Sequence, residues 1–170
     1  MFERVDPRAQ HDELVEVHLE YFSWVAERFE ALYGLSIPGI VGAPLQAVVD
    51  RMVRGLANRG ALDVFYLLKL GDRTAGMGGL HDLADDAVEM VKIFVRPEFR
   101  GARLGETLVD RLLEDARAAG FGQIRLSSAR FMIPAHRIYE ARGFADRSPY
   151  EGAGVPAPMV PFVRFMERSL

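Results

Sequence analysis

The chain has 170 residues, of which 49% are hydrophobic and 26% are charged, and its formal net charge is −3. This length and composition suit a single compact domain over residues 1–170 and argue against disorder. The weakly negative charge argues against binding to nucleic acid or to an anionic membrane surface. Because the chain has no cysteine, disulfides, thiolate catalysis and cysteine-ligated metals are excluded.

The N-terminal segment is charged from its third residue and lacks the apolar core of a signal peptide. No apolar run approaches the roughly 18 residues that would span a bilayer. We therefore expect a soluble, cytoplasmic protein.

The first part of the chain predicts a short strand and a long helix. Residues 2–5 can form a strand. Asp6 suits an N-cap and Pro7 a first helical residue, because proline lacks an N–H that would have no partner there. Apolar residues at helical spacing follow, and Gly34 predicts the end of this helix.

A second helix and three strands follow. Residues 35–44 are expected to form a loop, after which Pro44 opens a helix that Gly60 closes. The apolar pattern then changes to three strands joined by tight turns, which predicts an antiparallel meander. These strands are residues 61–70, 74–83 and 87–95. Glycines 76, 78 and 79 indicate that another group approaches the backbone closely, or that few side chains cover this strand.

The rest of the chain alternates between helices and strands, which predicts a mixed α/β (α+β) fold. Apolar spacing predicts a helix from Leu104 to Gly120 and a short helix over residues 134–142. The expected strands are residues 123–128, a segment from Phe144, and 162–170. The segment 148–161 between the last two strands is expected to be irregular.

Residues 95–108, VRPEFRGARLGETL, run from the end of a strand into a helix. A helix start presents unpaired N–H groups and a partial positive charge, and both suit a phosphate. Gly101 and Gly105 would let the backbone approach a ligand, and Arg100 and Arg103 add charged donors. The segment predicts a phosphate site, and the alternative is a plain strand-to-helix turn.

Two common phosphate motifs are absent from the sequence. A Walker loop needs Lys-Ser or Lys-Thr after its last glycine, whereas Gly105 is followed by Glu106 and Thr107. A dinucleotide fingerprint needs G-x-G-x-x-G, whereas GMGGLH at residues 76–81 has only the first two glycines and precedes no helix. A nucleotide-phosphate binder that uses the 95–108 segment is a weaker alternative.

Several segments together resemble the GNAT acetyltransferase superfamily, in particular a branch of small bacterial N-acetyltransferases. The family signature Q/R-x-x-G-x-G/A corresponds to RGARLG, in which Arg100 and Gly105 match and Arg103 replaces the middle glycine. The other matching segments are EMVKIFVRPEFRG (89–101), AHRIYEARGF (135–144) and the C-terminal PY…FMERSL.

The resemblance implies a mixed, mostly antiparallel sheet that splays between its fourth and fifth strands, with helices on both faces. It implies acetyl-coenzyme A as co-substrate and no metal. The pantetheine arm would pair with the backbone of Ile93, Phe94 and Val95. The phosphates would lie against the backbone of Arg100, Gly101, Ala102, Arg103, Leu104, Gly105, Glu106 and Thr107. Arg103 is expected to adopt the geometry of a first helical turn, with its side chain toward a phosphate or toward water.

The resemblance also implies that Tyr139 is the general acid that protonates the leaving thiolate. The alternative is a core tyrosine that packs beside Phe144. Glu89 is the candidate base, acting directly or through a water, because a carboxylate in an apolar strand is costly unless it is paired or functional. The alternative for Glu89 is a salt bridge with Arg125, and His81 is an alternative base.

Strand alternation places residues 89, 91, 93 and 95 on one face of their strand. A backbone N–H of the same strand would stabilise the oxyanion. His136 is interpreted as a surface imidazole, and Ser127 and Ser128 lack the G-x-S-x-G elbow of a hydrolase. Two positions depart from patterns in the resembling family, which often has Asn at position 132 and, in this branch, Asp at position 127. Met132 is only weak evidence against acetyltransferase activity. Ser127 lacks the carboxylate that aspartate would place near the site, so it bears on the identity of the substrate.

These features predict an N-acetyltransferase in which an amine attacks acetyl-coenzyme A directly in a ternary complex. The acceptor would be the primary amine of a small molecule or peptide. In the resembling family, residues corresponding to about 20–44 shape the acceptor pocket, where Tyr21 and Trp24 are candidates. Dimers are common in that family, so the final strand is a candidate interface for a homodimer. The alternative function is a non-catalytic acyl-coenzyme A sensor or interaction module.

Overall fold

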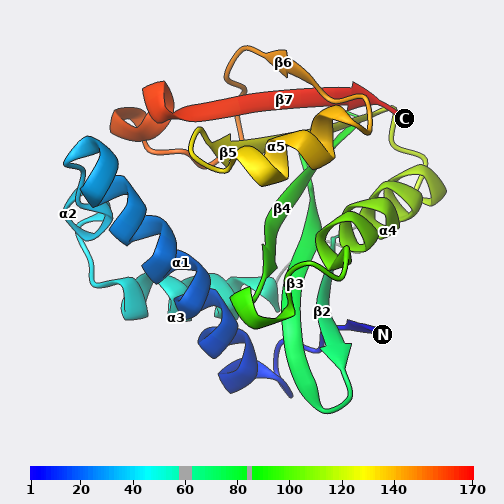
Figure 1. The fold of residues 1–170 in the computed structure, drawn as a ribbon, viewed down its shortest axis with the longest axis horizontal. Helices are drawn as coiled ribbons and strands as arrows, with labels where there is room; N and C mark the ends of the chain where they lie inside the picture. Colours follow the sequence, from blue (N-terminus) through cyan, green and yellow to red (C-terminus); the bar gives the residue numbers. More distant parts are fainter. Residues whose placement is uncertain (58–62, 84–85) are drawn as a thin grey trace. The chain divides into compact units, whose positions relative to one another are not determined.

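The computed structural model describes residues 1–57, 63–83 and 86–170 (Figure 1). The chain divides into two compact units, one formed by Val5–Arg59 and the other by Met1–Arg4 with Gly60–Leu170. The strands are β1 (Phe2–Arg4), β2 (Val64–Leu70), β3 (Arg73–Asp82), β4 (Ala87–Val95), β5 (Gln123–Ala129), β6 (Ala145–Arg147) and β7 (Val163–Ser169). All of them belong to the second unit.

The helical unit begins with α1 (His11–Tyr33). The predicted start at Pro7 is wrong. Asp6 Oδ1 accepts hydrogen bonds from the backbone N–H groups of Arg8 (3.0 Å) and Ala9 (3.4 Å), so this segment forms a turn before the helix. Gly34 ends α1 in the left-handed conformation (φ 66°), as predicted.

The segment expected to be a loop contains a short helix, α2 (Ile37–Val41). The Ser36 hydroxyl caps it by accepting a hydrogen bond from the Gly39 N–H at 3.2 Å. A five-residue helix has too few positions to show an apolar period, so periodicity could not reveal it. The next helix, α3 (Leu45–Leu56), begins directly after Pro44 as predicted, and the expected end at Gly60 lies outside the described residues.

The sheet unit contains a seven-stranded sheet in the order β1-β2-β3-β4-β5-β7-β6. Strands β1 to β4 pair antiparallel, which confirms the predicted meander. β4 and β5 are parallel, and the pairing covers only Ala87–Glu89 against Gln123–Arg125. Beyond this short contact the two strands diverge (Figure 1). The mixed, mostly antiparallel sheet that splays between its fourth and fifth strands is confirmed.

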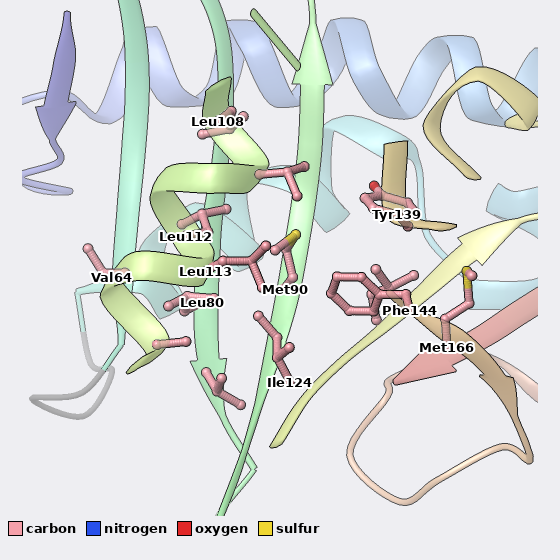
Figure 2. Packing of buried hydrophobic residues seen from close by; sticks show 14 of the residues in the cluster. Val64, Leu80, Met90, Leu108, Leu112, Leu113, Ile124, Tyr139, Phe144 and Met166 are labelled. Atoms are coloured by element: carbon pink, nitrogen blue, oxygen red, sulfur yellow. The ribbon is translucent and has the colours of Figure 1, made fainter. Parts of the chain in front are cut away.

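Two helices belong to the sheet unit, α4 (Leu104–Ala118) and α5 (Ile133–Glu140). Short 3₁₀ turns, η1 (Pro97–Phe99) and η2 (Ala157–Phe162), precede α4 and β7. Figure 2 shows the apolar side of α4 facing the sheet, with Leu112 and Leu113 near Met90 and Leu108 farther along the helix. These residues form one buried cluster with Tyr139, Phe144 and Met166. The predicted helices at 104–120 and 134–142 are confirmed within a few residues.

A β-bulge interrupts β4. The register pairs Val91 with Gly79 and Phe94 with Met77, so two residues of β4 lie opposite one residue of β3. Lys92, inside the bulge, has a positive φ of 57°. An extra residue of this kind reverses the alternation of side chains along the rest of a strand.

The bulge corrects the predicted faces of β4. Paired residues share a face, and the register places Phe94 rather than Ile93 on the face of Glu89 and Val91. Ile93 instead packs against the buried cluster under α4. The prediction that residues 93 and 95 share the face of Glu89 is therefore wrong.

The glycines of β3 are explained by close approach of neighbouring strands. A Cβ on Gly79 would lie 2.5 Å from the Val64 carbonyl oxygen and 2.5 Å from Cδ2 of Phe65. A Cβ on Gly76 would meet the Phe94 carbonyl oxygen. Of the two explanations open from the sequence, close backbone approach is confirmed.

Gly79→Ala is expected to lower the free energy of unfolding by about 1–3 kcal/mol, because the added methyl group overpacks β2 against β3. Gly55→Ala is the matched control, because a Cβ at this α3 position would meet no atom within 4 Å beyond its own helix backbone. The control should raise stability by about 0.5–1 kcal/mol. Urea unfolding of both variants checks the prediction, and equal effects of the two substitutions would contradict it.

Candidate active site

Glu89 lies at the point where β4 and β5 separate, and only 4% of its surface is exposed. Its Oε1 accepts a hydrogen bond from the Tyr150 hydroxyl at 2.7 Å and one from the Ser127 hydroxyl at 3.4 Å. The structure pairs Arg125 elsewhere, with its Nε 3.7 Å from a carboxylate oxygen of Glu167. The carboxylate of Glu89 is therefore held by hydroxyl donors.

Burial raises the pKa of Glu89 above its usual value, because the charged form is poorly solvated. The hydrogen bond from Tyr150 and the positive charge of Lys92 act in the opposite direction, and the net change is upward. A raised pKa brings a carboxylate closer to the range in which it both accepts and releases protons near neutral pH.

Tyr150 is a site residue that the sequence does not identify. Its only signal is the PY dipeptide, and it lies 61 residues from Glu89 in sequence, so no local pattern connects the two. Its ring packs edge-on against Phe165 (5.8 Å), and the guanidinium groups of Arg125 and Arg147 lie 5.5 and 5.0 Å from its centroid. Burial and the neighbouring Glu89 raise the pKa of Tyr150, so it is a hydrogen-bond donor.

Tyr150→Phe is expected to raise the pKa of Glu89 further, because the hydroxyl stabilises the charged carboxylate and lowers that pKa. Carbon-13 NMR of glutamate carboxyls across pH measures the change. Tyr66→Phe is the control, since the Tyr66 hydroxyl bonds Arg111 and not Glu89. A titration of Glu89 that moves to lower pH, or stays in place, would count against this geometry.

Tyr139 lies on α5 and is 5% exposed. Its ring packs edge-on against Phe144 with centroids 5.8 Å apart, which is the core packing that the sequence offered as an alternative (Figure 2).

The residue before Tyr139, Ile138, lies where three elements meet. A Cβ on Gly105 would lie 3.5 Å from Ile138 and 3.9 Å from Val95, so α5, the start of α4 and the end of β4 meet there.

The turn before α4 presents backbone N–H groups at the helix start. Thr107 N–H bonds the carbonyl of Arg103 at 3.0 Å and closes the first helical turn. The N–H groups of Leu104, Gly105 and Glu106 come before it and have no acceptor within the helix. This arrangement suits an anion such as a phosphate.

Arg103 has the left-handed conformation, with φ 58° and ψ 17°. The expectation of helical first-turn geometry is wrong, because Arg103 is the capping residue before the first helical residue, Leu104, and such a residue need not have helical angles. Its guanidinium donates to both carboxylate oxygens of Glu106, at 3.2 and 3.0 Å, and the side chain is 80% exposed. The Arg100 Nε donates to the carbonyl of Val95 at 3.1 Å. Both arginines therefore bond protein groups.

Arg142 connects the end of α5 to the first turns of α4. Its guanidinium donates to both carboxylate oxygens of Asp110 and to the carbonyl of Ile138. This pairing lowers the pKa of Asp110. The start of α4 is thus fixed in place by a side chain from the segment that contains Tyr139.

A family model described as "Acetyltransferase (GNAT) family" matches residues 38–144, which include β4, the turn before α4, and α5. This chain belongs to the GNAT family. The resemblance inferred from RGARLG and AHRIYEARGF is confirmed.

The GNAT chain also has similar relatives and structures. A protein from Azospirillum brasilense named IAA acetyltransferase is 35% identical over 82 residues, which are 48% of this chain and 51% of that protein. The chain spans about half or less of the length of the curated relatives it matches.

Solved structures share the GNAT fold over the whole chain. A GNAT-family acetyltransferase from Staphylococcus aureus Mu50 has a TM-score of 0.73 at 17% identity, covering 100% of this chain and 98% of that one. PaiA N-acetyltransferase from Thermoplasma acidophilum, solved in complex with coenzyme A, has a TM-score of 0.70 at 17% identity, covering 100% and 98%.

In this GNAT chain His136 is buried, so its interpretation as a surface imidazole is wrong. Its Nε2 lies 3.1 Å from the Ser128 hydroxyl, and burial lowers the pKa of the imidazole. The sequence pattern of α5 did not predict the burial of His136, because this residue follows Pro134 on a helix that is too short to define a buried face.

Within residues 1–57, 63–83 and 86–170, no helix is long and apolar enough to cross a membrane. The same ranges contain no cluster of three or more His, Asp or Glu side chains placed to hold a metal ion.

Arg103→Gly is expected to keep acetyl-coenzyme A binding by this GNAT chain within about tenfold of the wild type. Glycine adopts the left-handed conformation without a steric penalty, and the side chain that is removed bonds Glu106. Titration calorimetry measures the affinity, with Arg54→Gly in α3 as a control for loss of an arginine elsewhere. A much larger loss would mean that Arg103 itself binds a phosphate.

Proposed function

We propose that this chain is an acetyl-coenzyme A-dependent N-acetyltransferase that transfers the acetyl group to a primary amine within a ternary complex. The observation that carries the proposal is the position of Glu89. A buried carboxylate with a raised pKa lies at the last paired residue of β4 and β5, on the strand that leads directly to the start of α4.

The co-substrate would extend from the splay to the start of α4. Since β5 pairs with β4 from Ala87 to Glu89, the pantetheine arm would take the place of β5 farther along β4, beside the backbone of Ile93 and Phe94. The carbonyl of Val95 already accepts a hydrogen bond from Arg100, so the backbone of Val95 would contribute less to pairing with the pantetheine arm. The phosphates would lie against the backbone of residues 100–107, where helix N–H groups and glycine at 101 and 105 fit an anion.

The reaction would begin with proton transfer from the ammonium group of the acceptor to Glu89, directly or through a water. The amine nitrogen attacks the thioester carbonyl carbon, and a backbone N–H of β4 stabilises the resulting oxyanion. The C–S bond then breaks, the Tyr139 hydroxyl protonates the leaving thiolate, and the second proton that the nitrogen loses on becoming an amide restores the Tyr139 hydroxyl. Because the chain has no cysteine, no acyl-cysteine intermediate forms.

The acceptor would be a small-molecule or peptide amine, and the final strand, β7, would contribute to the interface of a homodimer.

Two measurements test the function. Release of free coenzyme A is followed with polyamines, amino acids, aminoglycosides and short peptides as acceptors. Calorimetry compares acetyl-coenzyme A with ATP and NAD.

Turnover of one class of amine together with binding of acetyl-coenzyme A supports the proposal. Tight binding of acetyl-coenzyme A without acetylation of any amine in the panel would favour the non-catalytic sensor. Preferential binding of ATP or NAD would favour a nucleotide-phosphate binder.

A further inference from the structure

Ionisable side chains form a row across the sheet at the level of Glu89. His81 of β3 pairs in register with Glu89, and Glu89 pairs with Arg125 of β5. Arg125 in turn pairs with Glu167 of β7. Asp63 precedes Val64, which pairs with Leu80, so Asp63 continues the row on the other side of His81. Acidic and basic residues alternate along this row.

Asp63 holds the imidazole of His81. Asp63 Oδ1 lies 3.2 Å from Nδ1 of His81 and accepts the backbone N–H of Asp82 at 2.7 Å. The Asp63 side chain is 6% exposed, so this carboxylate is fixed, whereas the side chain of His81 is 40% exposed. A carboxylate that faces Nδ1 favours the tautomer with the proton on Nδ1 and leaves Nε2 as a proton acceptor.

The proposed reaction requires a route for one proton. An ammonium acceptor and a thioester give an amide, a thiol and one proton, so each turnover releases one proton. Glu89 receives this proton and must lose it before the next turnover. Because Glu89 is 4% exposed, solvent alone gives it little access.

The side chains that act on the pKa of Glu89 include Tyr150, Lys92, His81 and Ser127. Tyr150 and Ser127 donate hydrogen bonds to the carboxylate, and Lys92 carries a positive charge, so none of these three is a ready proton acceptor near neutral pH. An imidazole is such an acceptor. His81 lies opposite Glu89 in the register of β3 and β4, and its side chain is 40% exposed to solvent.

We propose that His81, oriented by Asp63, carries the proton from Glu89 to solvent. This inference rests on the proposed function. In this step the O–H bond of protonated Glu89 breaks, and the proton forms an N–H bond at Nε2 of His81, directly or through one water. The imidazolium then gives a proton to solvent, so that Glu89 is again a carboxylate and His81 is again neutral. Asp63 is a positioning residue.

The kinetic test uses the best amine of the acceptor panel with saturating acetyl-coenzyme A. His81→Ala is expected to lower kcat at least tenfold with unchanged acetyl-coenzyme A affinity, and added imidazole should restore part of kcat. His11→Ala is the matched control, because His11 also lies 3.2 Å from an aspartate, Asp12, but belongs to the helical unit. Full kcat in His81→Ala, or equal losses in the two variants without rescue, overturns the proposal.

The structural test needs no acceptor. Nitrogen-15 NMR of the imidazole of His81 should show the proton on Nδ1, and Asp63→Asn should weaken this preference while keeping an oxygen for the Asp82 N–H. A wild-type proton on Nε2 overturns the relay, even if amines are acetylated. A proton on Nδ1 supports the orientation by Asp63 that the relay requires, and this result does not depend on whether the panel finds an acceptor.

Discussion

Glu89→Gln is expected to lower kcat about 100-fold or more, which is the usual scale for loss of a general base. Glutamine keeps the size of the side chain and still offers an oxygen to the Tyr150 hydroxyl, but it cannot take a proton from the ammonium group. The affinity for acetyl-coenzyme A should stay within about twofold. Steady-state kinetics with the best amine and calorimetry with acetyl-coenzyme A measure the two effects.

The same substitution is expected to raise stability at neutral pH. Because the pKa of Glu89 in the folded protein lies above its usual value, the folded state binds the proton more tightly than the unfolded state. The cost of the buried carboxylate is therefore fully present above the raised pKa and disappears as the pH falls through that pKa toward the usual value. Thermal unfolding of Glu89→Gln and wild type should differ most above the raised pKa and converge in acid.

Glu114→Gln is the matched control, because this residue lies exposed on α4. It should change neither kcat nor the pH dependence of stability. If Glu89→Gln keeps kcat within a few-fold of wild type for every accepted amine, Glu89 is not the base. If it also lacks the gain in stability, the burial of the carboxylate is not what sets its pKa.

Tyr139→Phe is expected to lower kcat about 100-fold, because only the hydroxyl that would protonate the thiolate is removed. Its ring packs on Phe144 through carbon atoms, so the free energy of unfolding should change by no more than about 1 kcal/mol. Consumption of acetyl-coenzyme A, measured by rapid quenching under single-turnover conditions, separates the chemical step from product release.

The matched control is Tyr33→Phe, since Tyr33 also packs edge-on against a phenylalanine, Phe29, with centroids 5.4 Å apart. It lies in the helical unit and should keep full kcat. If the Tyr139→Phe variant acetylates every amine as fast as the wild type, Tyr139 is not the general acid. Its role would then be core packing against Phe144.

Local signals were sufficient for much of the fold. Period-two alternation revealed the meander of β2 to β4, and helical spacing revealed α3 and α4. The motif at residues 100–105 revealed the family and, through the family, the splay between β4 and β5. The sequence did not reveal α2, which is held by a single serine cap, or the turn that delays the start of α1.

The candidate site was predicted only in part, because its remaining features depend on distant residues or on backbone conformation. Glu89 stood out as an acid in an apolar strand, but its donor Tyr150 comes from a distant loop. The left-handed conformation of Arg103 is unusual, because it places the Cβ of an L-residue too close to the backbone. The sequence therefore favoured a helical conformation of lower energy at this position. Asp63 became relevant only when the register placed it beside His81.

The bulge at Lys92 gives β4 one residue more than its partner strand β3 requires. Deletion of Lys92 would let β4 pair with β3 without a bulge, with Ile93 opposite Gly78 and Phe94 still opposite Met77. Ile93 would keep its place against the buried cluster under α4, and Phe94 would keep the face of Glu89. Deletion of Lys92 should therefore disturb β4 less than deletion of a residue outside the bulge, which would move one part of the strand to the opposite face.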